Sequence, residues 1–584
     1  MIEARLDDLR AGRERSFRFE EPEGAVEALR IDEVAGAIDA AEAAAARGLW
    51  AVGFVAYEAA PGLAPALVVR DPVPGLPLAW FGLFGRRVAA DPPPAAHAPA
   101  PGADGSAWRA EVDPDRYCAD VAAIREAIAA GDTYQVNFTI RLRARIAGDV
   151  RGLYRDLVLA QRGGYGAYLD TGRHRIASAS PELFFELDGG RVTTRPMKGT
   201  ALRGRYEEED LAIAEALAAS DKDRAENAMI VDLLRNDLGR IARPGTVAVP
   251  SMFDLERYET VWQLTSTVAC EPRPATTLLD VFRALFPCGS VTGAPKVRTM
   301  GFIRDLEDAP RGVYCGAVGY VAPPGAEGPR AAFNVAIRTA VVDAATGAAE
   351  YGAGGGITYA SDPDAEYAEA LAKTRVLAAA RPAFDLVETL RLEDGAYADL
   401  EDHLARLASS ARYFGFVHDE GAVRDALGGA AALERAPRRV RLALARGGAV
   451  ALEVGDLPAP PEGPVPLVLD DEPVDPADVW LFHKTTNRGV YDRRAARHPD
   501  AEVVLVNARG EVTETPIANL AVRLDGRWWT PPRDAGLLAG AARARLLRSG
   551  ELAERPIPVA AFVGAEAVAL VSSVRGWREA ALAR

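Results

Sequence analysis

Four carboxylic residues occur as two pairs, and each pair has the spacing of neighbours on one helix face. Asp223 and Glu226 are three positions apart, and Glu366 and Glu369 repeat this spacing. Side chains three or four residues apart project from the same side of an α-helix. If the two helix faces meet, their oxygen atoms form a site suited to Mg²⁺, which favours carboxylates with water and substrate oxygens. The spacing also agrees with two solvated helix faces, and that alternative stays open.

Two glycine-rich segments accompany these acidic pairs along the chain. Residues 288–296 are CGSVTGAPK and residues 351–361 are YGAGGGITYAS. Backbone N–H groups that glycine leaves accessible can bind the carboxylate of a small anion. Neither segment has the GxxxxGKS/T or GxGxxG pattern, so nucleotide binding is not indicated. On pattern alone, both segments could also be simple turns.

Helical and strand patterns alternate around these segments. Residues 114–130 have an apolar helical repeat followed by Gly131, which predicts a helix that ends there. Alternating apolar residues predict strands over 133–146 and 439–446, and an apolar run predicts a buried strand over 501–507. The sequence therefore indicates a mixed α and β fold with antiparallel sheets.

The amino-acid composition excludes several classes of protein. Of the 584 residues, 49% are apolar and 26% are charged, which allows several buried cores and excludes a mostly disordered chain. The net charge of −15 argues against a nucleic-acid or anionic-membrane binder. The four cysteines form no CxxC pair, the start is too charged for a signal peptide, and no apolar run could span a membrane. We therefore expect a cytoplasmic protein.

Seven motifs within residues 114–378 together resemble one enzyme family. They occur in the order YQVNFT, RPMKGT, IVDLLRNDLGR, GSVTGAPK, YCGAVGY, FNVAIRT and GAGGGIT. This series is similar to that of the chorismate-utilising enzymes, which include the anthranilate, aminodeoxychorismate, isochorismate and salicylate synthases. The resemblance implies a large domain of packed antiparallel sheets with helices, in which chorismate binds beside Mg²⁺.

The resemblance also implies roles for individual residues. Glu226 and Glu369 match the direct or near-direct Mg²⁺ ligands, and Asp223 and Glu366 match the second acidic pair. The other matches concern chorismate itself: Arg338 and Tyr314 would hold a carboxylate, Thr200 would contact the substrate, and the backbone N–H groups of Gly354, Gly355 and Gly356 would assist.

Two positions distinguish members of this family. Lys198 stands where anthranilate synthases carry a small residue, and the lysine form is similar to aminodeoxychorismate synthase. The lysine would attack the chorismate ring, which needs a neutral amine, and an enclosed site disfavours the ammonium form. Gln263 stands where anthranilate synthases typically have a histidine associated with pyruvate elimination, and glutamine cannot shuttle a proton. An anthranilate-type or a salicylate-type synthase, the latter with the lysine as a base for water, remains an alternative.

Residues 384–584 carry a second series of motifs. Lys484 lies in FHKTTNR, Glu514 in EVTETPIANL and Arg406 in HLARLASSARYFG, and LLAGAARARLL and VSSVRGW follow. These motifs resemble the class IV aminotransferases, whose two α/β subdomains surround pyridoxal 5'-phosphate; the proline-rich 457–466 would mark their junction. The resemblance implies that Lys484 bonds the cofactor, Glu514 contacts its pyridine nitrogen and Arg406 its phosphate. The other phosphate contacts would come from Gly540, Ala541, Ala542, Ser572 and Ser573.

Together the two resemblances predict a bifunctional enzyme. A chorismate-binding domain would occupy 1–380, with 92–105 as a surface loop and a break near 379–383, and a pyridoxal-phosphate domain would occupy 381–584. The first would convert chorismate and ammonia to 4-amino-4-deoxychorismate. The second would eliminate pyruvate and release 4-aminobenzoate, a folate precursor.

Partners and alternatives follow from the same motifs. No cysteine has a GxCxG setting, so ammonia would come from a separate glutamine amidotransferase subunit or from solution. The C-terminal domain could also pair two chains into a homodimer. One alternative is that this domain is an aminotransferase for D- or branched-chain amino acids. Another is that it is a scaffold that has lost its cofactor.

Overall fold

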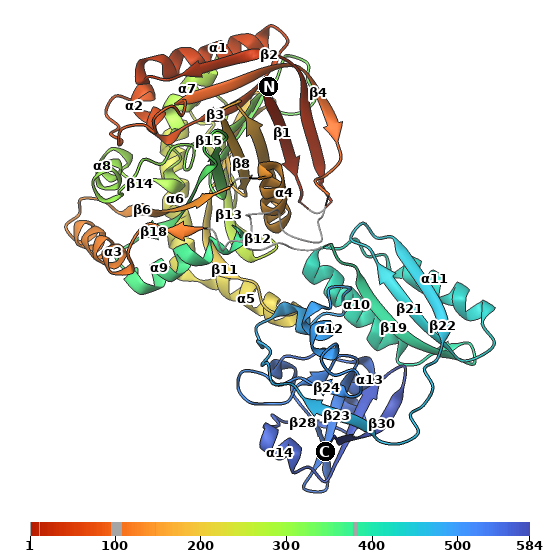
Figure 1. Ribbon diagram of the computed structural model, residues 1–584. Helices are drawn as coiled ribbons and strands as arrows, with labels where there is room; N and C mark the ends of the chain where they lie inside the picture. Colours follow the sequence, from red (N-terminus) through yellow and green to blue (C-terminus); the bar gives the residue numbers. More distant parts are fainter. Residues whose placement is uncertain (1, 11, 95–107, 147, 378–382, 584) are drawn as a thin grey trace. The chain divides into compact units, whose positions relative to one another are not determined.

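A computed structural model describes residues 2–10, 12–94, 108–146, 148–377 and 383–583. The chain divides into two compact units (Figure 1). The first unit comprises Met1–Arg203 and Ala214–Pro382, and the second comprises Gly204–Ile213 and Ala383–Arg584. The predicted loop at 92–105 and the break at 379–383 lie largely outside the described residues. Within those ranges, every helix is too short or too polar to cross a bilayer.

The first unit is built on one large antiparallel sheet. Among the described residues its strands are β1 (Glu3–Asp8), β2 (Arg15–Ala28), β3 (Trp50–Val55), β4 (Ala79–Ala90), β5 (Arg109–Ala110), β6 (Gln135–Arg145), β7 (Tyr165–Asp170), β8 (His174–Ser180), β9 (Leu183–Asp188), β10 (Arg191–Arg195), β11 (Met197–Leu202), β12 (Ala248–Arg257), β13 (Val261–Cys270), β14 (Gly293–Ala294), β15 (Ala317–Val321), β16 (Ala331–Val335), β17 (Thr339–Asp343) and β18 (Ala348–Ile357).

The pairing of these strands is continuous. It runs β13–β10–β9–β16–β15–β3–β4–β2–β1–β7–β8–β17–β18–β6. Strands β11 and β12 pair with β13, and β5 and β14 pair with β6. Because β6 and β18 are neighbours, the segments YQVNFT and GAGGGIT lie side by side although they are far apart in sequence.

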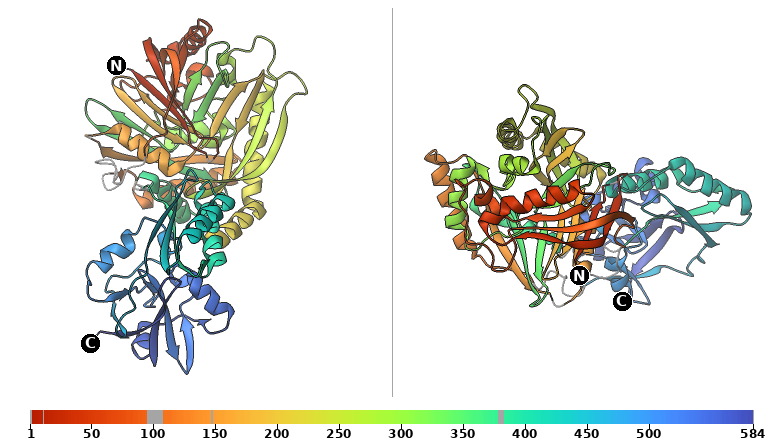
Figure 2. Two further views of the ribbon diagram at one scale, coloured as in Figure 1. Left: turned by 90° about the vertical axis from the view of Figure 1, so that its right-hand side faces the viewer. Right: turned by 90° about the horizontal axis from the view of Figure 1, so that it is seen from above.

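Helices cover this sheet and carry the acidic pairs. They are α1 (Val34–Ala46), α2 (Ala60–Leu63), α3 (Pro114–Ala129), α4 (Val150–Gln161), α6 (Asp221–Gly239), α7 (Leu278–Leu285), α8 (Lys296–Leu306) and α9 (Pro363–Ala372), while α5 (Glu207–Ala219) contains the division between the units. Helix α1 packs on β2, β3 and β4 (Figures 1 and 2). Helix α6 packs on β11 and β13, and α9 packs on β18 beside α3 (Figure 1).

The predicted helix and strand that precede the first site are confirmed. Helix α3 begins after Asp113, whose carboxylate accepts hydrogen bonds from the N–H groups of Asp115 and Arg116, and Pro114 occupies its first turn. Strand β6 follows the positive-φ Gly131. Its apolar side chains, including Phe138 and Ile140, are buried in the main core. The sequence pattern therefore places YQVNFT in the interior of the sheet.

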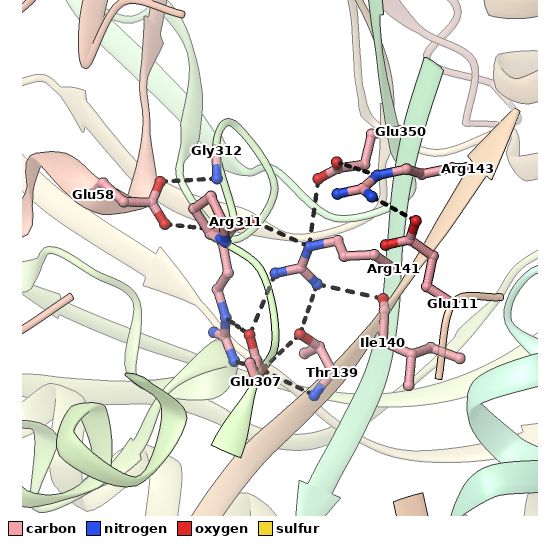
Figure 3. Close-up of polar contacts among 11 residues, drawn as sticks. Glu58, Glu111, Thr139, Ile140, Arg141, Arg143, Glu307, Arg311, Gly312 and Glu350 are labelled. Carbon is pink, nitrogen blue, oxygen red and sulfur yellow. Dashed lines mark hydrogen bonds and ion pairs between the residues drawn. The ribbon is translucent and has the colours of Figure 1, made fainter. Parts of the chain in front are cut away.

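A buried ion network fixes the segment that leads into YCGAVGY (Figure 3). Glu307 follows α8 and contacts Arg311 at 2.6 Å and Arg141 at 3.3 Å, and all three side chains are at most 5% exposed. Arg311 also donates hydrogen bonds of 2.7 Å to the carbonyl groups of Val291 and Asn137. Arg311 thus ties together three segments that are distant in sequence.

The second unit contains two separate sheets (Figures 1 and 2). The first sheet has the order β20–β19–β21–β22 and the second has β24–β23–β30–β29–β26–β27–β28, with β25 paired to β26. The strands are β19 (Leu386–Glu393), β20 (Ala396–Tyr397), β21 (Arg438–Leu444), β22 (Val450–Asp456), β23 (Val465–Leu469), β24 (Glu502–Val504), β25 (Glu514–Thr515), β26 (Ala518–Leu524), β27 (Arg527–Thr530), β28 (Ala553–Glu554), β29 (Ala567–Ser572) and β30 (Gly576–Leu582). The helices are α10 (Leu400–Phe414), α11 (Glu420–Leu433), α12 (Gly489–Ala495), α13 (Ala541–Arg548) and α14 (Val559–Val563).

Three sequence expectations can be compared with this unit. The strand predicted over 439–446 is confirmed as β21, and the proline-rich 457–466 does connect the two sheets. The strand predicted over 501–507 is shorter, because only Glu502–Val504 pair with β23. That pair is parallel, as are β23–β30 and β27–β28, so this sheet is mixed, whereas the sequence indicated antiparallel pairing in general.

Residues 204–213 pack into the second unit. The Tyr413 hydroxyl donates a hydrogen bond of 2.6 Å to the Gly204 carbonyl. The ring of Tyr206 lies 5.4 Å from that of Phe482, and Arg205 contacts Asp534 at 3.1 Å. The second unit is therefore not one continuous stretch of sequence.

Candidate active sites

The first unit contains a cavity of about 350 Å³ that gathers the residues expected to bind chorismate. Its lining includes both acidic pairs, from α6 and α9. It also includes Lys198, Thr200, Gln263, Tyr314, Arg338, Gly354, Gly355 and Gly356. All the residues predicted to bind Mg²⁺ or chorismate thus line one cavity. The two helices that carry the acidic pairs meet there.

Each acidic pair is held by a neighbouring side chain. Ser220 caps α6 and donates a hydrogen bond of 2.5 Å to Asp223, and Ser361 donates one of 2.7 Å to Glu366. Lys373 contacts Glu369 at 2.7 Å, which lowers the pKa of Glu369. Burial raises the pKa of Glu226 and that of Glu366, and neighbouring carboxylates raise both further.

The donor set of this cavity fits Mg²⁺. Among the described residues, no three His, Cys, Asp or Glu side chains converge on one point as a metal cage. Mg²⁺ usually binds through only one or two carboxylates and takes its other ligands from water and substrate. Glu366 and Glu369 on successive turns of α9 and Glu226 on α6 supply such carboxylates.

Lys198 lies on β11 inside this cavity. The Asn227 amide donates hydrogen bonds of 3.2 Å to the carbonyl groups of Lys198 and Leu264, which fixes the strand at this point. A Cβ atom on Gly356 would lie 2.0 Å from Gln135 Nε2 and 2.6 Å from the Lys198 Nζ atom, so a larger residue would displace both side chains. Burial lowers the pKa of Lys198, which favours the neutral amine.

A glutamic acid that sequence reasoning missed lies in the same cavity. Glu182 follows β8, is 3% exposed, and accepts a hydrogen bond of 2.6 Å from the Ser290 hydroxyl. Burial raises the pKa of Glu182 to about 7. A carboxyl group with such a pKa can donate a proton near neutral pH. The only sequence signal was an acidic residue within an otherwise apolar segment, ASPELFF.

The remaining predicted substrate contacts have defined neighbours. The Thr200 hydroxyl donates a hydrogen bond of 3.1 Å to the Gln263 side chain. Arg338 contacts Gln161 at 3.0 Å. The ring of Tyr314 is buried against Gly352, where a Cβ atom would lie 2.2 Å from a ring carbon. GAGGGIT is thus a strand and not a turn, since Ala348–Ile357 pairs with β6 throughout.

The second unit has its own cavity, of about 230 Å³. Its lining contains every residue that the sequence predicted to bind the cofactor: Arg406, Lys484, Glu514, Gly540, Ala541, Ala542, Ser572 and Ser573. Lys484 is fixed beside β19, because its carbonyl accepts a hydrogen bond of 2.9 Å from the Val387 N–H group. Burial and the neighbouring Arg406 lower the pKa of Lys484 to about 8.

Glu514 and Arg406 are both held by other side chains. Glu514 accepts hydrogen bonds of 2.8 Å from the Tyr491 hydroxyl and 3.1 Å from the Leu538 N–H group, and burial raises its pKa to about 8. Arg406 binds the Glu388 carboxylate through two nitrogen atoms, at 2.9 and 2.6 Å. Although burial opposes it, Arg406 lowers the pKa of Glu388 to about 2.

These residues fit pyridoxal phosphate. Helix α13 begins at Ala541 and no side chain caps its first turn, so its N–H groups are available to a phosphate. A lysine with a lowered pKa can bond an aldehyde, and a buried carboxyl group suits a pyridine nitrogen. Lys484, Glu514 and the start of α13 all face the same cavity.

Comparison with known proteins agrees with this geometry. Residues 4–379 match the family described as chorismate binding enzyme, over most of the chain. The chain belongs to the chorismate-binding enzyme family. Residues 385–582 match a second family, amino-transferase class IV. A chorismate-binding domain is therefore fused to a class IV aminotransferase domain, and the mixed α/β fold expected from the sequence is confirmed.

Individual relatives match part of the chorismate-binding domain. Aminodeoxychorismate synthase of Streptomyces griseus is 42% identical over 266 residues, which are 45% of this chain and 36% of that protein. Aminodeoxychorismate synthase component 1 of Klebsiella aerogenes is 41% identical over 268 residues, 46% of this chain and 58% of that protein. The crystal structure of anthranilate synthase component I from Streptococcus pneumoniae superposes with a TM-score of 0.54 at 26% identity, covering 62% of this chain and 92% of that one. The chain thus spans less than two thirds of the curated relatives that it matches.

Proposed function

We propose that the chain makes 4-aminobenzoate in two consecutive reactions. The first cavity would convert chorismate and ammonia to 4-amino-4-deoxychorismate, and the second would release pyruvate from that product. The observation that carries the proposal is the meeting of Lys198 with Glu182 in the chorismate cavity. An amine with a lowered pKa and a carboxyl group with a pKa of about 7 form a nucleophile and an acid.

In the first reaction, each residue has a defined task. The Lys198 Nζ atom forms a bond to a ring carbon while the C4–O bond breaks and the ring double bonds shift. Glu182 supplies the proton with which the departing hydroxyl leaves as water. Ammonia then forms a bond at C4, and the lysine amine departs. Arg338 and Tyr314 would hold the substrate carboxylate, and Glu226 and Glu369 would hold Mg²⁺ beside it.

In the second reaction, Lys484 moves the proton. Lys484, Glu514, Arg406 and the start of α13 would hold pyridoxal phosphate, which would supply an electron sink. With a pKa of about 8, the Lys484 amine can accept the proton from the amine-bearing ring carbon. The bond from the ring to the enolpyruvyl oxygen then breaks, and the enol takes up a proton to become pyruvate. The ring that remains is aromatic, which makes the reaction effectively irreversible.

Ammonia would come from a separate glutamine amidotransferase. The Klebsiella relative is named as component 1 of its synthase, which implies a second component. All four cysteines of this chain are free, and three of them are buried. None has the exposure of an amidotransferase nucleophile together with its motif. Ammonium salts should therefore replace the partner in an assay.

Two variants of the full chain test the proposal. With chorismate, ammonium, Mg²⁺ and pyridoxal phosphate, the wild type should release 4-aminobenzoate and pyruvate. Lys484→Ala should accumulate 4-amino-4-deoxychorismate, and Lys198→Ala should make neither product from chorismate yet still convert supplied aminodeoxychorismate. Release of anthranilate or salicylate by the wild type would contradict the first reaction. Transamination of D- or branched-chain amino acids without 4-aminobenzoate formation would contradict the second.

A further inference from the structure

The cavity of the second unit carries more positive charge than its proposed cofactor needs. Its lining contains five arginines and one lysine, but Glu514 is its only carboxylic residue among those that the structure describes. Most of these cations have partners. Arg406 is matched by Glu388, Arg543 contacts Glu554 at 2.5 Å and Arg488 contacts Asp492 at 3.4 Å. Arg575 has no such partner among the described residues, and Arg439, although it contacts Glu453, leaves one buried donor unpaired.

These two arginines come from different sheets and face the same space. Arg439 lies on β21, and Arg575 lies in the turn between β29 and β30. Arg575 forms no ion pair with a carboxylate of the described chain. Arg439 has one contact, at 3.3 Å, with Glu453, which is itself 61% exposed. The Arg439 Nε atom is buried without a hydrogen-bond partner within the described ranges.

A third arginine, Arg578, lies outside the cavity lining but interacts with Arg575. It is 7% exposed and donates a hydrogen bond of 2.9 Å to Glu502 through Nη1. Its Nε and Nη2 atoms are buried and lack partners among the residues described. Arg575 is exposed; its partial burial and then the neighbouring Arg578 and Arg439 lower its pKa. Buried donors without partners are rare and indicate a missing acceptor.

We propose that Arg439 and Arg575, supported by Arg578, bind a carboxylate of the substrate that is remote from its amino group. The proposal rests on the proposed function, since 4-amino-4-deoxychorismate carries two carboxylates, one on the ring and one on the enolpyruvyl group. Guanidinium groups bind carboxylates with two parallel hydrogen bonds. A branched-chain amino acid presents an apolar side chain here and would leave the buried Arg439 Nε atom unpaired. The pair therefore selects cyclic dicarboxylates.

Arginines bind phosphates as well as carboxylates. The experiment must therefore distinguish binding of a substrate carboxylate from binding of the cofactor phosphate. Benzene-1,3-dicarboxylate and benzoate are titrated calorimetrically into the pyridoxal-phosphate-loaded full chain. The dicarboxylate should bind more tightly than benzoate. Arg575→Met and Arg439→Met should each weaken dicarboxylate binding by roughly 10- to 100-fold, the contribution of hydrogen bonds to charged groups. Affinity for pyridoxal phosphate should stay within about twofold, since neither residue would touch it.

The control is Arg438→Met, on the same strand but paired with Glu434 and absent from the cavity. It should bind both probes as the wild type does. Equal binding of dicarboxylate and benzoate by the wild type would overturn the proposal. So would loss of pyridoxal phosphate in the Arg575 and Arg439 variants, because these arginines would then hold the cofactor.

Steady-state kinetics distinguish a failure of the proposed carboxylate site from a failure of the proposed function. In the two variants, the KM for aminodeoxychorismate should rise far more than kcat falls. If the wild type releases 4-aminobenzoate while neither variant changes KM, the carboxylate subsite is wrong and the lyase reaction stands. If the variants lose dicarboxylate binding but the wild type never consumes aminodeoxychorismate, the subsite stands and the proposed reaction is wrong.

Discussion

Ser290 donates its hydroxyl hydrogen to the Glu182 carboxylate at 2.6 Å, inside the cavity that also contains Lys198. The serine lies in GSVTGAPK and the glutamate in ASPELFF, so the hydrogen bond joins two segments 108 positions apart. This contact holds Glu182 in one orientation. Because burial raises the pKa of this carboxyl group to about 7, it is largely protonated in mildly acidic solution.

Glu182→Gln should therefore change both the rate and the pH profile of the first reaction. A residue that donates a proton is active below its pKa, so the wild-type rate should fall as the pH rises above about 7. The glutamine variant should lose this falling limb and run roughly 10²- to 10⁴-fold slower. The measurement is kcat for amination of chorismate across pH. Glu186→Gln, on β9 and outside the cavity, is the control. An unchanged falling limb in Glu182→Gln would show that another group titrates.

Glu369→Gln should abolish the chorismate reaction and leave the second reaction intact. The change removes one negative oxygen donor from α9, and Mg²⁺ affinity depends on the charge of its few protein ligands. Mg²⁺ binding measured by calorimetry should weaken together with amination, while supplied aminodeoxychorismate should still be converted. Asp364→Asn on the exposed side of the same helix is the control and should behave as the wild type. Full amination by Glu369→Gln would remove this residue from the metal site.

The rate of cofactor loading should depend on the ionisation of Lys484. Only the neutral amine can bond the aldehyde, and its pKa is lowered to about 8. The rate should rise as the pH increases toward 8 and level off above it, because the neutral fraction is then complete. The measurement is the growth of visible absorbance after pyridoxal phosphate is added to the cofactor-free chain. Lys484→Ala should show no such growth, and a rate that keeps rising to pH 10 would indicate an ordinary surface lysine.

Arg311→Met should destabilise the first unit. The change leaves Glu307 with only Arg141 as a charged partner in the interior (Figure 3). Removing one partner of a buried ion pair typically costs about 3–5 kcal/mol. Arg86→Met removes an exposed pair with Glu20 and should cost at most about 1 kcal/mol. Urea unfolding, followed by fluorescence, measures the free energy of unfolding of the two variants. Equal losses of stability would mean that the buried network contributes little to it.

Sequence patterns found those residues whose roles are marked by their immediate neighbours. The spacing of Glu366 and Glu369 places them together on a helix, and the motif RPMKGT singles out Lys198. Glu182 has no such marker, because its properties come from burial and from a serine far along the chain. Arg439 and Arg575 are likewise brought together only by two separate sheets. Long-range packing is the information that a local pattern does not contain.

The boundaries of some elements also depended on tertiary structure. The apolar run 501–507 continues past β24, since Leu505 is also buried but only Glu502–Val504 pair with β23. Leu505 and Val506 bond through their backbones to residues 512–514 instead, and an apolar run does not reveal which partner a segment takes. The helix predicted over 114–130, by contrast, is fixed by local signals at both ends: the cap at Asp113 and the glycine at 131.

The placement of residues 204–213 in the second unit limits how the protein can be divided. A gene fragment that begins at residue 381 would lack the Gly204 carbonyl that accepts from Tyr413 and the Tyr206 ring beside Phe482. Those buried groups would meet water or remain unsatisfied, at a cost in solubility and yield. A separately produced class IV aminotransferase domain would therefore need this short peptide supplied in trans, or rejoined to residue 383 by a new linker.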